Sequence, residues 1–219
     1  MLVAQSLSFS YSATANIFTD ISIEIEPGDR LAIVGPSGSG KSTLLKVLGA
    51  VLQYDHGTLH YHDSLVNSEF APKYLRDIGW ITQNPGIFPS RTALENVTLL
   101  LELLGVAPKL AQMQGLEALT AVGLREKAHQ KVGLFSGGET YRVSIARTVA
   151  KKPPIIFADE ITAMLDFETS LSVLEALAPD VTDESALVMA THDPTAAKFA
   201  DKVLELRNGK LAEISGIKR

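Results

Sequence analysis

The 219-residue sequence contains no cysteine, which excludes disulfide frameworks, thiolate metal sites and cysteine nucleophiles. It also lacks a basic excess, because 20 lysines and arginines stand against 25 aspartates and glutamates, for a formal net charge of -5. A protein whose whole surface binds nucleic acid usually shows such an excess. We therefore expect no nucleic-acid partner, although this balance is compatible with a local phosphate site.

Long apolar runs are missing as well. The most apolar stretch, residues 96–107, is short and contains Glu102, whereas a membrane-spanning helix needs roughly 18 or more apolar residues. The N-terminal residues lack the basic and apolar regions of a secretory signal. With 46% hydrophobic and 21% charged residues, the composition is that of a soluble globular chain with a substantial core.

The apolar patterns that are present predict an α/β fold. Residues 21–26 alternate between apolar and polar side chains, which is typical of a half-buried antiparallel strand. Continuous apolar runs at 31–34, 155–158 and 187–190 indicate strands covered on both faces, and helical spacing after the first run indicates a parallel sheet with helices. The Asn208-Gly209 pair predicts a hairpin near the end.

No strand pattern is evident between about residues 85 and 149. We therefore predict one domain over residues 1–219: an α/β core made of residues 1–84 and 150–219, with an antiparallel N-terminal part, and a helical subdomain inserted at residues 85–149.

A phosphate-binding loop follows the first buried strand. Its glycines allow backbone N–H groups to curl around phosphate oxygens, and the helix that begins there presents its positive end to them. We expect the lysine to reach the β- and γ-phosphates of a nucleotide and the first hydroxyl after it to ligate Mg²⁺. The residues concerned are Gly35, Ser37, Gly38, Ser39, Gly40, Lys41, Ser42 and Thr43.

Two carboxylates end the buried strand at 155–158. In a parallel sheet this position lies at the carboxyl edge, where α/β proteins bind their ligands. Asp159 therefore suits a Mg²⁺ coordination shell, and Glu160 suits a general base that polarises the attacking water. Acidic residues end many strands without any function, so the phosphate loop upstream is what makes this interpretation persuasive.

A third motif, Phe135-Ser136-Gly137-Gly138-Glu139, combines a capping box with two glycines at a predicted helix start. An ordinary helix cap is the alternative interpretation. With the three motifs in this order, the chain resembles the ATPase subunits of ATP-binding cassette (ABC) transporters over essentially its whole length. The resemblance implies an ABC ATPase fold of the P-loop NTPase class, with ATP and Mg²⁺ as ligands, and implies that residues 136–139 contact ATP held by the opposite subunit.

The same resemblance implies roles for four single residues. Gln83 is similar to the glutamine that senses Mg²⁺, and His192 to the switch histidine that contacts the γ-phosphate. Tyr11 stands where the family stacks an aromatic ring on adenine, and Asp166 where an aspartate crosses the dimer interface. The expected catalytic set is therefore Glu160, His192 and Lys41, and the expected metal ligands are Ser42, Gln83 and Asp159.

The chain departs from the family pattern around two of these motifs. Phe135 replaces the usual leucine of the signature, which is commonly written LSGGQ, and Thr140 and Tyr141 stand where glutamines are common. Ile161 replaces a proline after Glu160, and Met164 replaces a smaller residue before the aspartate. These departures affect the expected dimer contact rather than the residues expected to perform hydrolysis.

The segment 91–107 and the Ser-Gly-Gly-Glu form of the signature resemble the lipoprotein-release and macrolide-export branch of the family. The resemblance implies a second copy of the chain, an integral membrane permease as partner, a peripheral location at the cytoplasmic face of the membrane, and export of an amphiphilic substrate. The alternatives are an importer ATPase and a soluble ABC ATPase that transports nothing.

Overall fold

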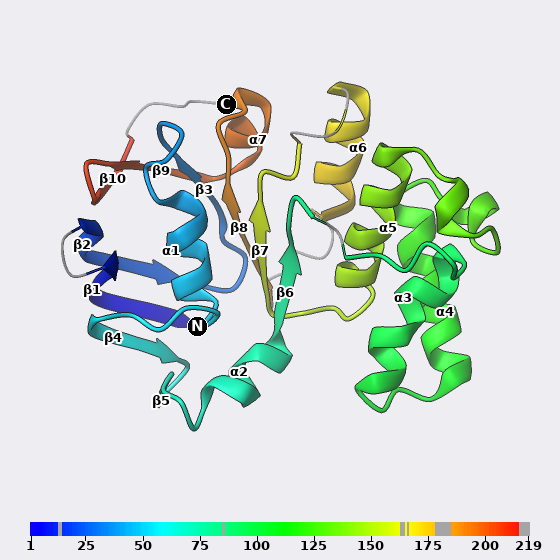
Figure 1. Ribbon diagram of the computed structural model, residues 1–219, viewed down its shortest axis with the longest axis horizontal. Helices are drawn as coiled ribbons and strands as arrows, with labels where there is room; N and C mark the ends of the chain where they lie inside the picture. The colour runs from blue at the N-terminus through cyan, green and yellow to red at the C-terminus, as the bar shows by residue number, and fades with distance from the viewer. Residues whose placement is uncertain (13–14, 85, 163–164, 166, 178–184, 215–219) are drawn as a thin grey trace. The chain divides into compact units, whose positions relative to one another are not determined.

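The computed structural model describes residues 1–12, 15–84, 86–162, 165, 167–177 and 185–214 (Figure 1). The chain divides into two compact units. The α/β unit comprises Met1–Ile78, Pro154–Glu160 and Val181–Arg219, and the helical unit comprises Gly79–Pro153 and Ile161–Asp180. The expected helical insertion, residues 85–149, lies inside the helical unit, which also takes in residues 79–84, 150–153 and 161–180 of the expected core.

One sheet of the α/β unit is antiparallel, with the strand order β2-β1-β4-β5. Side chains along β1 alternate between buried and more exposed positions, and a bulge at Ser6, whose φ is 49°, keeps Ala4 and Leu7 on the buried side. The alternation that predicted an antiparallel N-terminal part is therefore confirmed. The strands are β1 (Leu2–Ser12), β2 (Ala15–Ile25), β4 (His56–Tyr61) and β5 (Ser64–Leu65).

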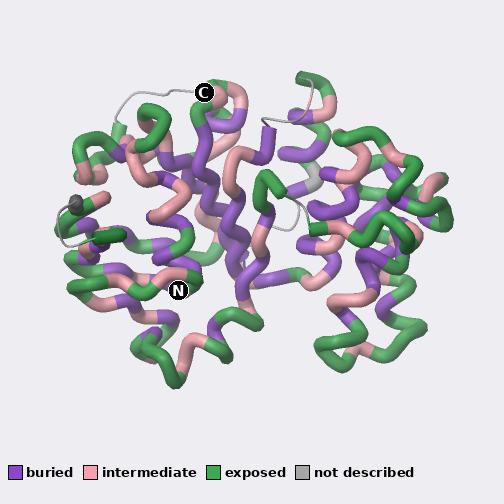
Figure 2. Tube along the Cα trace, viewed as in Figure 1, coloured by how far each residue is buried: buried purple, intermediate pink, exposed green. Residues whose placement is uncertain are grey.

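The other sheet of this unit contains the strands that were predicted from continuous apolar runs. In the order β10-β9-β3-β8-β7, the last four strands are parallel and β10 is antiparallel to β9. Every residue of β8 is buried (Figure 2), as a strand covered on both faces requires. The bounds are β3 (Arg30–Val34), β7 (Ile155–Asp159), β8 (Ala186–Ala190), β9 (Lys202–Arg207) and β10 (Lys210–Glu213).

Three helices of the α/β unit lie in its described residues. Helix α1 (Lys41–Leu48) begins at the phosphate loop and packs against β7 and β8, and α7 (Pro194–Phe199) packs against β3. Helix α2 (Ala71–Asp77) is attached to the end of α1, because the fully buried Tyr74 donates a hydrogen bond of 2.8 Å to the Leu48 carbonyl oxygen. Because β3, β7 and β8 are parallel, the loops that follow them share one edge of the sheet.

The helical unit begins at Gly79, within the strand β6 (Ile78–Ile81). Helix α3 packs against α4 and α5, and α5 also packs against α6. Gly115 permits the close approach of α4 to α3, since a Cβ atom there would lie 2.9 Å from Leu94 Cδ1. The helices are α3 (Ala93–Leu103), α4 (Pro108–Ala121), α5 (Gly137–Val149) and α6 (Phe167–Leu177), with 3₁₀ turns η1 (Arg125–Lys127) and η2 (Val132–Leu134). Within the described ranges, no helix is long and apolar enough to cross a bilayer.

Candidate nucleotide-binding and hydrolysis site

The phosphate loop connects β3 to α1 and is held from behind by neighbouring strands. A Cβ atom on Gly35 would lie 2.4 Å from the carbonyl oxygen of Leu206, and one on Gly40 would lie 2.6 Å from Ile17 Cγ2. Gly40 also has a φ of 101°, which side chains other than glycine rarely adopt. Both positions therefore require glycine, which explains why the sequence pattern has it there.

Two polar groups of the loop are buried. Lys41 is only 7% exposed, and its ammonium donates hydrogen bonds to the carbonyl oxygens of Gly35 at 3.0 Å and Pro36 at 3.1 Å. The Ser39 hydroxyl is buried without a hydrogen-bond partner. An unpaired buried hydroxyl is costly, and the loop therefore offers an unused donor beside a lysine charge, which suits a phosphate.

Asp159 at the end of β7 lies next to the first residues of α1. The Ser42 hydroxyl donates a 2.8 Å hydrogen bond to Asp159 Oδ1. Burial raises the pKa of Asp159 above its usual value and the Glu160 charge adds to this, whereas the hydrogen bond from Ser42 and the charges of Lys46 and Lys41 oppose it. Two adjacent oxygen ligands are what Mg²⁺ prefers in proteins, so this pair fits the metal expected there.

Glu160 and His192 form a second pair at the same edge of the sheet. The Glu160 Oε2 atom lies 2.7 Å from His192 Nδ1, with the carboxylate 12% and the imidazole 70% exposed. The Glu160 backbone has a φ of 54°, and its N–H donates to the Ala190 carbonyl oxygen at 2.9 Å. This conformation turns the glutamate side chain toward the loop that follows β8.

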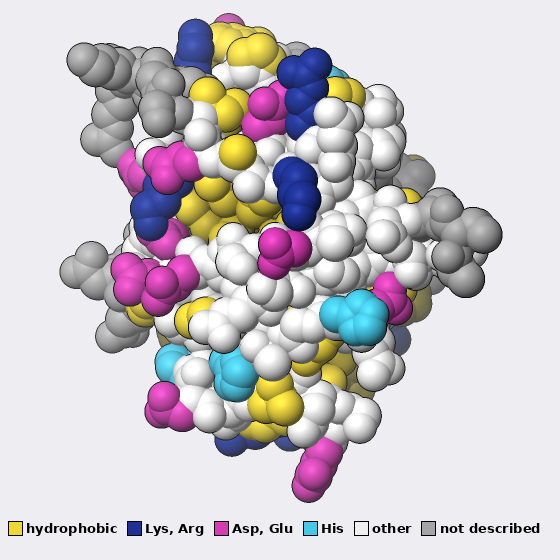
Figure 3. Space-filling view, turned by 90° about the vertical axis from the view of Figure 1, so that its left-hand side faces the viewer, with side chains coloured by type: hydrophobic (Ala, Val, Ile, Leu, Met, Phe, Trp, Pro, Cys, Tyr) yellow, Lys and Arg dark blue, Asp and Glu magenta, His cyan; other side chains and the backbone are white. Residues whose placement is uncertain are grey.

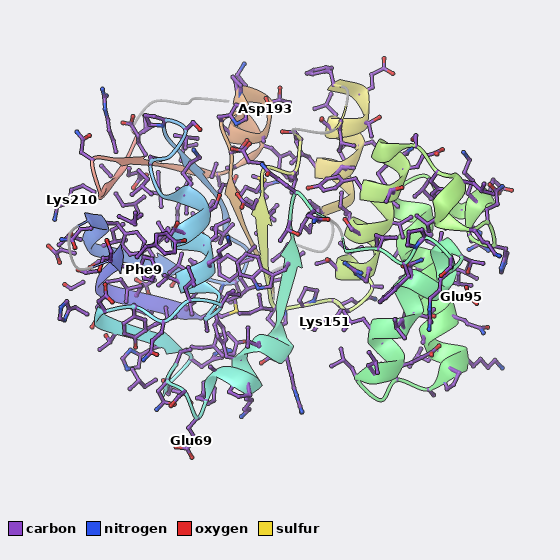
Figure 4. All side chains as sticks on the ribbon, in the orientation of Figure 1. Phe9, Glu69, Glu95, Lys151, Asp193 and Lys210 are labelled. Carbon is purple, nitrogen blue, oxygen red and sulfur yellow. The ribbon has the colours of Figure 1, made fainter. Side chains whose placement is uncertain are left out.

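The loop that carries His192 is fixed by its neighbours. Thr191 is fully buried; its N–H donates to the Ile33 carbonyl oxygen at 3.1 Å and its hydroxyl accepts from the Asp193 N–H at 3.0 Å. Asp193 then caps α7 by accepting from the Thr195 N–H at 2.7 Å (Figure 4). The sequence analysis did not single out Thr191 and Asp193, although a Thr-x-Asp-Pro run is a recognisable helix start.

Tyr11 lies at the end of β1, and its side chain is 62% exposed. Its ring packs edge-on against Phe9, with 4.9 Å between the ring centroids. Its hydroxyl lies 3.2 Å from the Thr43 hydroxyl, and either oxygen can donate. An exposed ring that is tethered to the first turn of α1 provides a flat surface beside the phosphate loop.

The signature segment lies in the helical unit, where the predicted capping box is confirmed. Ser136 Oγ accepts a 3.2 Å hydrogen bond from the Glu139 N–H, and Glu139 Oε2 accepts a 2.9 Å hydrogen bond from the Ser136 N–H. Glu139 also accepts a hydrogen bond from Lys127, a contact that no local sequence pattern predicts. Because Gly137 and Gly138 carry no side chains, the first turn of α5 is open to a ligand.

Gln83 and Asp166 are the last two residues expected in the site. Gln83 is exposed and follows β6 in the helical unit, while Asp166 lies outside the described residues.

A groove of about 410 Å³ lies between the segment after Gln83 and the signature segment. Its lining residues are Asn84, Gly86, Ile87, Pro89, Val132, Gly133, Phe135 and Thr140.

A family model described as "ABC transporter" matches residues 18–163. The chain belongs to the ABC transporter family. Over 209 residues this ABC protein is 37% identical to the lipoprotein-releasing system ATP-binding protein LolD of Protochlamydia amoebophila, an alignment covering 93% of this chain and 92% of that protein. Over 201 residues it is 34% identical to the putative hemin import ATP-binding protein HrtA of Staphylococcus aureus. That alignment covers 90% of this chain and 91% of HrtA.

Solved ABC cassettes have the same fold. A dimeric cassette, MJ0796, described as post-hydrolysis and bound to ADP and Pi, superimposes with a TM-score of 0.85 at 29% identity, covering 99% of this chain and 100% of that one. A second dimeric structure of MJ0796 gives a TM-score of 0.86. The predicted ABC ATPase fold is therefore confirmed, and the chain is an ATP-hydrolysing subunit of the ABC type.

Proposed function

We propose that this ABC ATPase powers a membrane transporter in which two copies of the chain close around two molecules of ATP with Mg²⁺. The observation that carries the proposal is the grouping of two pairs at one sheet edge: Ser42 with Asp159 at 2.8 Å, and Glu160 with His192 at 2.7 Å. One pair suits a metal–phosphate site and the other suits proton transfer.

The residues of the α/β unit have separable roles in hydrolysis. Lys41 exchanges its contacts with the loop carbonyl oxygens for the β- and γ-phosphates of ATP. Glu160 accepts a proton from the attacking water, and His192, which faces its carboxylate, orients that group and the γ-phosphate. When bound, Mg²⁺ neutralises charge on the phosphate oxygens, and Ser42 and Asp159 would hold it.

A second copy of the chain is part of the proposed site. The open N-terminus of α5, at Ser136, Gly137 and Gly138, is suited to a phosphate but belongs to the helical unit. Each ATP would then lie between the phosphate loop of one copy and this helix end of the other. The dimeric form of the MJ0796 cassette supports this arrangement.

The membrane partner we propose is an integral permease docked on the helical unit, with this chain at the cytoplasmic face. The groove of about 410 Å³ beside the signature segment is a suitable site, since two exposed apolar side chains, Phe88 and Leu134, lie in the segments that line it. These side chains are 49% and 82% exposed. Larger exposed apolar patches mark surfaces that bind a partner, so we expect Phe88 and Leu134 to contribute to the docking surface.

We favour export of an amphiphilic substrate, such as a lipoprotein, peptide, antibiotic or haem, because of the 37–38% identity to lipoprotein-releasing ATPases. An importer ATPase is the second candidate, favoured by the similarity to HrtA. A soluble, non-transporting ATPase acting on nucleic acid is less favoured, since basic and acidic side chains are interspersed on the face of the α/β unit shown in Figure 3.

Co-purification from detergent-solubilised membranes tests the proposal. We expect the tagged chain to recover an integral membrane protein at one copy per ATPase, with ATP hydrolysis stimulated in the complex. Lys41→Ala is the matched variant: it should recover the same partner but lose hydrolysis, because a charge-assisted contact to phosphate is removed. Recovery with ribosomes or DNA and without a membrane protein would contradict the proposal and favour the soluble alternative.

A further inference from the structure

Glu139 is the centre of a small polar cluster in the helical unit. Its Oε2 atom accepts from the Ser136 N–H at 2.9 Å, and its Oε1 atom accepts from the Lys127 ammonium. Lys127 lies at the end of η1 and its side chain is 43% exposed, whereas that of Glu139 is 18% exposed. Both oxygens of this carboxylate are therefore held, one by the capping box and one by a lysine from a separate turn.

The position of this carboxylate creates an electrostatic problem for the proposed function. An acidic residue in the first turn stabilises a helix, because it faces the positive end of the helix dipole. The same charge repels an anion that approaches the bare glycines Gly137 and Gly138. A neutral glutamine at this position, as in the LSGGQ form, makes the capping box without that repulsion.

The charge of Glu139 is present at neutral pH. The hydrogen bond from Lys127, followed by that from the Ser136 backbone, lowers the pKa of the glutamate below its usual value. The carboxylate is therefore ionised in the folded chain, and a positive charge placed beside it would offset its repulsion of an anion.

Lys127 is held where it can do this. Its ammonium contacts the carboxylate of Glu139 and lies 5.7 Å from the centre of the Phe135 ring, a cation–π distance. Phe135 and Glu139 are also the two positions at which this signature differs from LSGGQ. Both differences thus contact the same lysine.

We propose that Lys127 is a positioning residue for the nucleotide site: it neutralises Glu139 and so allows the N-terminus of α5 to receive the phosphates of ATP. The inference rests on the proposed function, in which this helix end meets nucleotide held by a second copy. Lys127 acts through Glu139 and does not itself contact ATP.

A double-mutant cycle tests this role. We expect Lys127→Met to raise the KM for ATP about tenfold at low salt, with little change in kcat at saturating ATP. The increase in KM should be smaller at high salt, because salt screens exposed charges. In a Glu139→Gln background the same lysine change should alter KM less than about twofold. Lys127→Arg should keep the wild-type KM, and Lys109→Met, at an exposed lysine of α4, should have no effect.

A purely structural role for Lys127 gives a different pattern. Lys127→Met would then lower the melting temperature and kcat equally in both backgrounds, and the inference would be wrong. The inference would also be wrong if Lys127→Met had the same KM for ATP as wild type at low salt. Failure of the proposed function is a separate outcome, in which the wild-type chain itself hydrolyses no ATP and forms no ATP-dependent dimer; the inference would fail with it.

Discussion

At the scale of single residues, substitutions of Tyr11 can distinguish the contribution of its ring to nucleotide binding from that of its hydroxyl. Its ring is exposed and its hydroxyl contacts Thr43 at 3.2 Å. If the ring stacks on adenine, Tyr11→Ala should weaken ATP binding by about 1–3 kcal/mol, or roughly 5- to 150-fold, whereas Tyr11→Phe should bind as well as wild type. Titration with a fluorescent ATP analogue measures both affinities.

Tyr54→Phe, which removes a hydroxyl from another tyrosine of the α/β unit, is the control for that titration. If Tyr11→Phe bound ATP as weakly as Tyr11→Ala, the hydroxyl and its contact with Thr43 would be the functional feature instead of the ring. If neither variant differed from wild type, Tyr11 would have no part in adenine binding.

The residues of the candidate site differ in how far the sequence could reveal them. Gly35, Gly40 and Lys41 belong to a local pattern whose spacing follows from the shape of a phosphate loop. The sequence alone was therefore sufficient to predict this loop. The pairing of Ser42 with Asp159 joins residues 117 positions apart and could be anticipated only because both follow buried parallel strands. The contact of Lys127 with Glu139 is tertiary and has no local signal, so the sequence could not reveal it.

At the scale of helices and strands, the sequence predicted what periodicity or backbone geometry determines. The hairpin of β9 and β10 was foreseen because Asn208 and Gly209 both adopt positive φ values, 51° and 71°. Helix α2 and strand β6 were not, because α2 is seven residues long and has no side-chain cap, and β6 is four residues containing a glycine. Such elements are stabilised by tertiary contacts, like that of Tyr74 with Leu48.

The capping box of α3 makes a prediction about pH at this scale. Glu95 Oε2 accepts from the Thr92 N–H at 2.7 Å, and Thr92 Oγ1 accepts from the Glu95 N–H at 3.1 Å (Figure 4 shows Glu95 on this helix). The backbone hydrogen bond from Thr92 is the main cause that lowers the pKa of Glu95 below 4.5. Its contribution to stability is therefore present above about that pH and lost as the pH falls through the folded-state pKa.

We expect Glu95→Gln to melt at a lower temperature than wild type at neutral pH, with the difference shrinking as the pH falls below about 4.5. Circular dichroism melts across this range measure it. Glu117→Gln, at an exposed position of α4, is the control for removing a carboxylate from a helix. A difference between Glu95→Gln and wild type that stayed constant down to low pH would contradict this account of the cap.

At the scale of the whole molecule, the two units carry different halves of the proposed site. The α/β unit holds the phosphate loop with Asp159, Glu160 and His192, and the helical unit holds Gln83 and the N-terminus of α5. In the proposed dimer, ATP joins the halves of two copies, so hydrolysis removes the link. A variant that binds ATP but does not hydrolyse it should therefore accumulate the closed pair.

Glu160→Gln is the variant that isolates this step. The amide keeps the shape of the side chain but cannot accept a proton, and loss of a general base typically slows a reaction ~10²–10⁴-fold. We expect size-exclusion chromatography to show a dimer of Glu160→Gln with ATP and a monomer with ADP. Glu24→Gln, an exposed carboxylate on β2, should hydrolyse ATP as wild type does. If Glu160→Gln were fully active, another group would be the base, and His192 is the nearest candidate. If the variant were inactive and stayed monomeric with ATP, closure would not depend on the γ-phosphate.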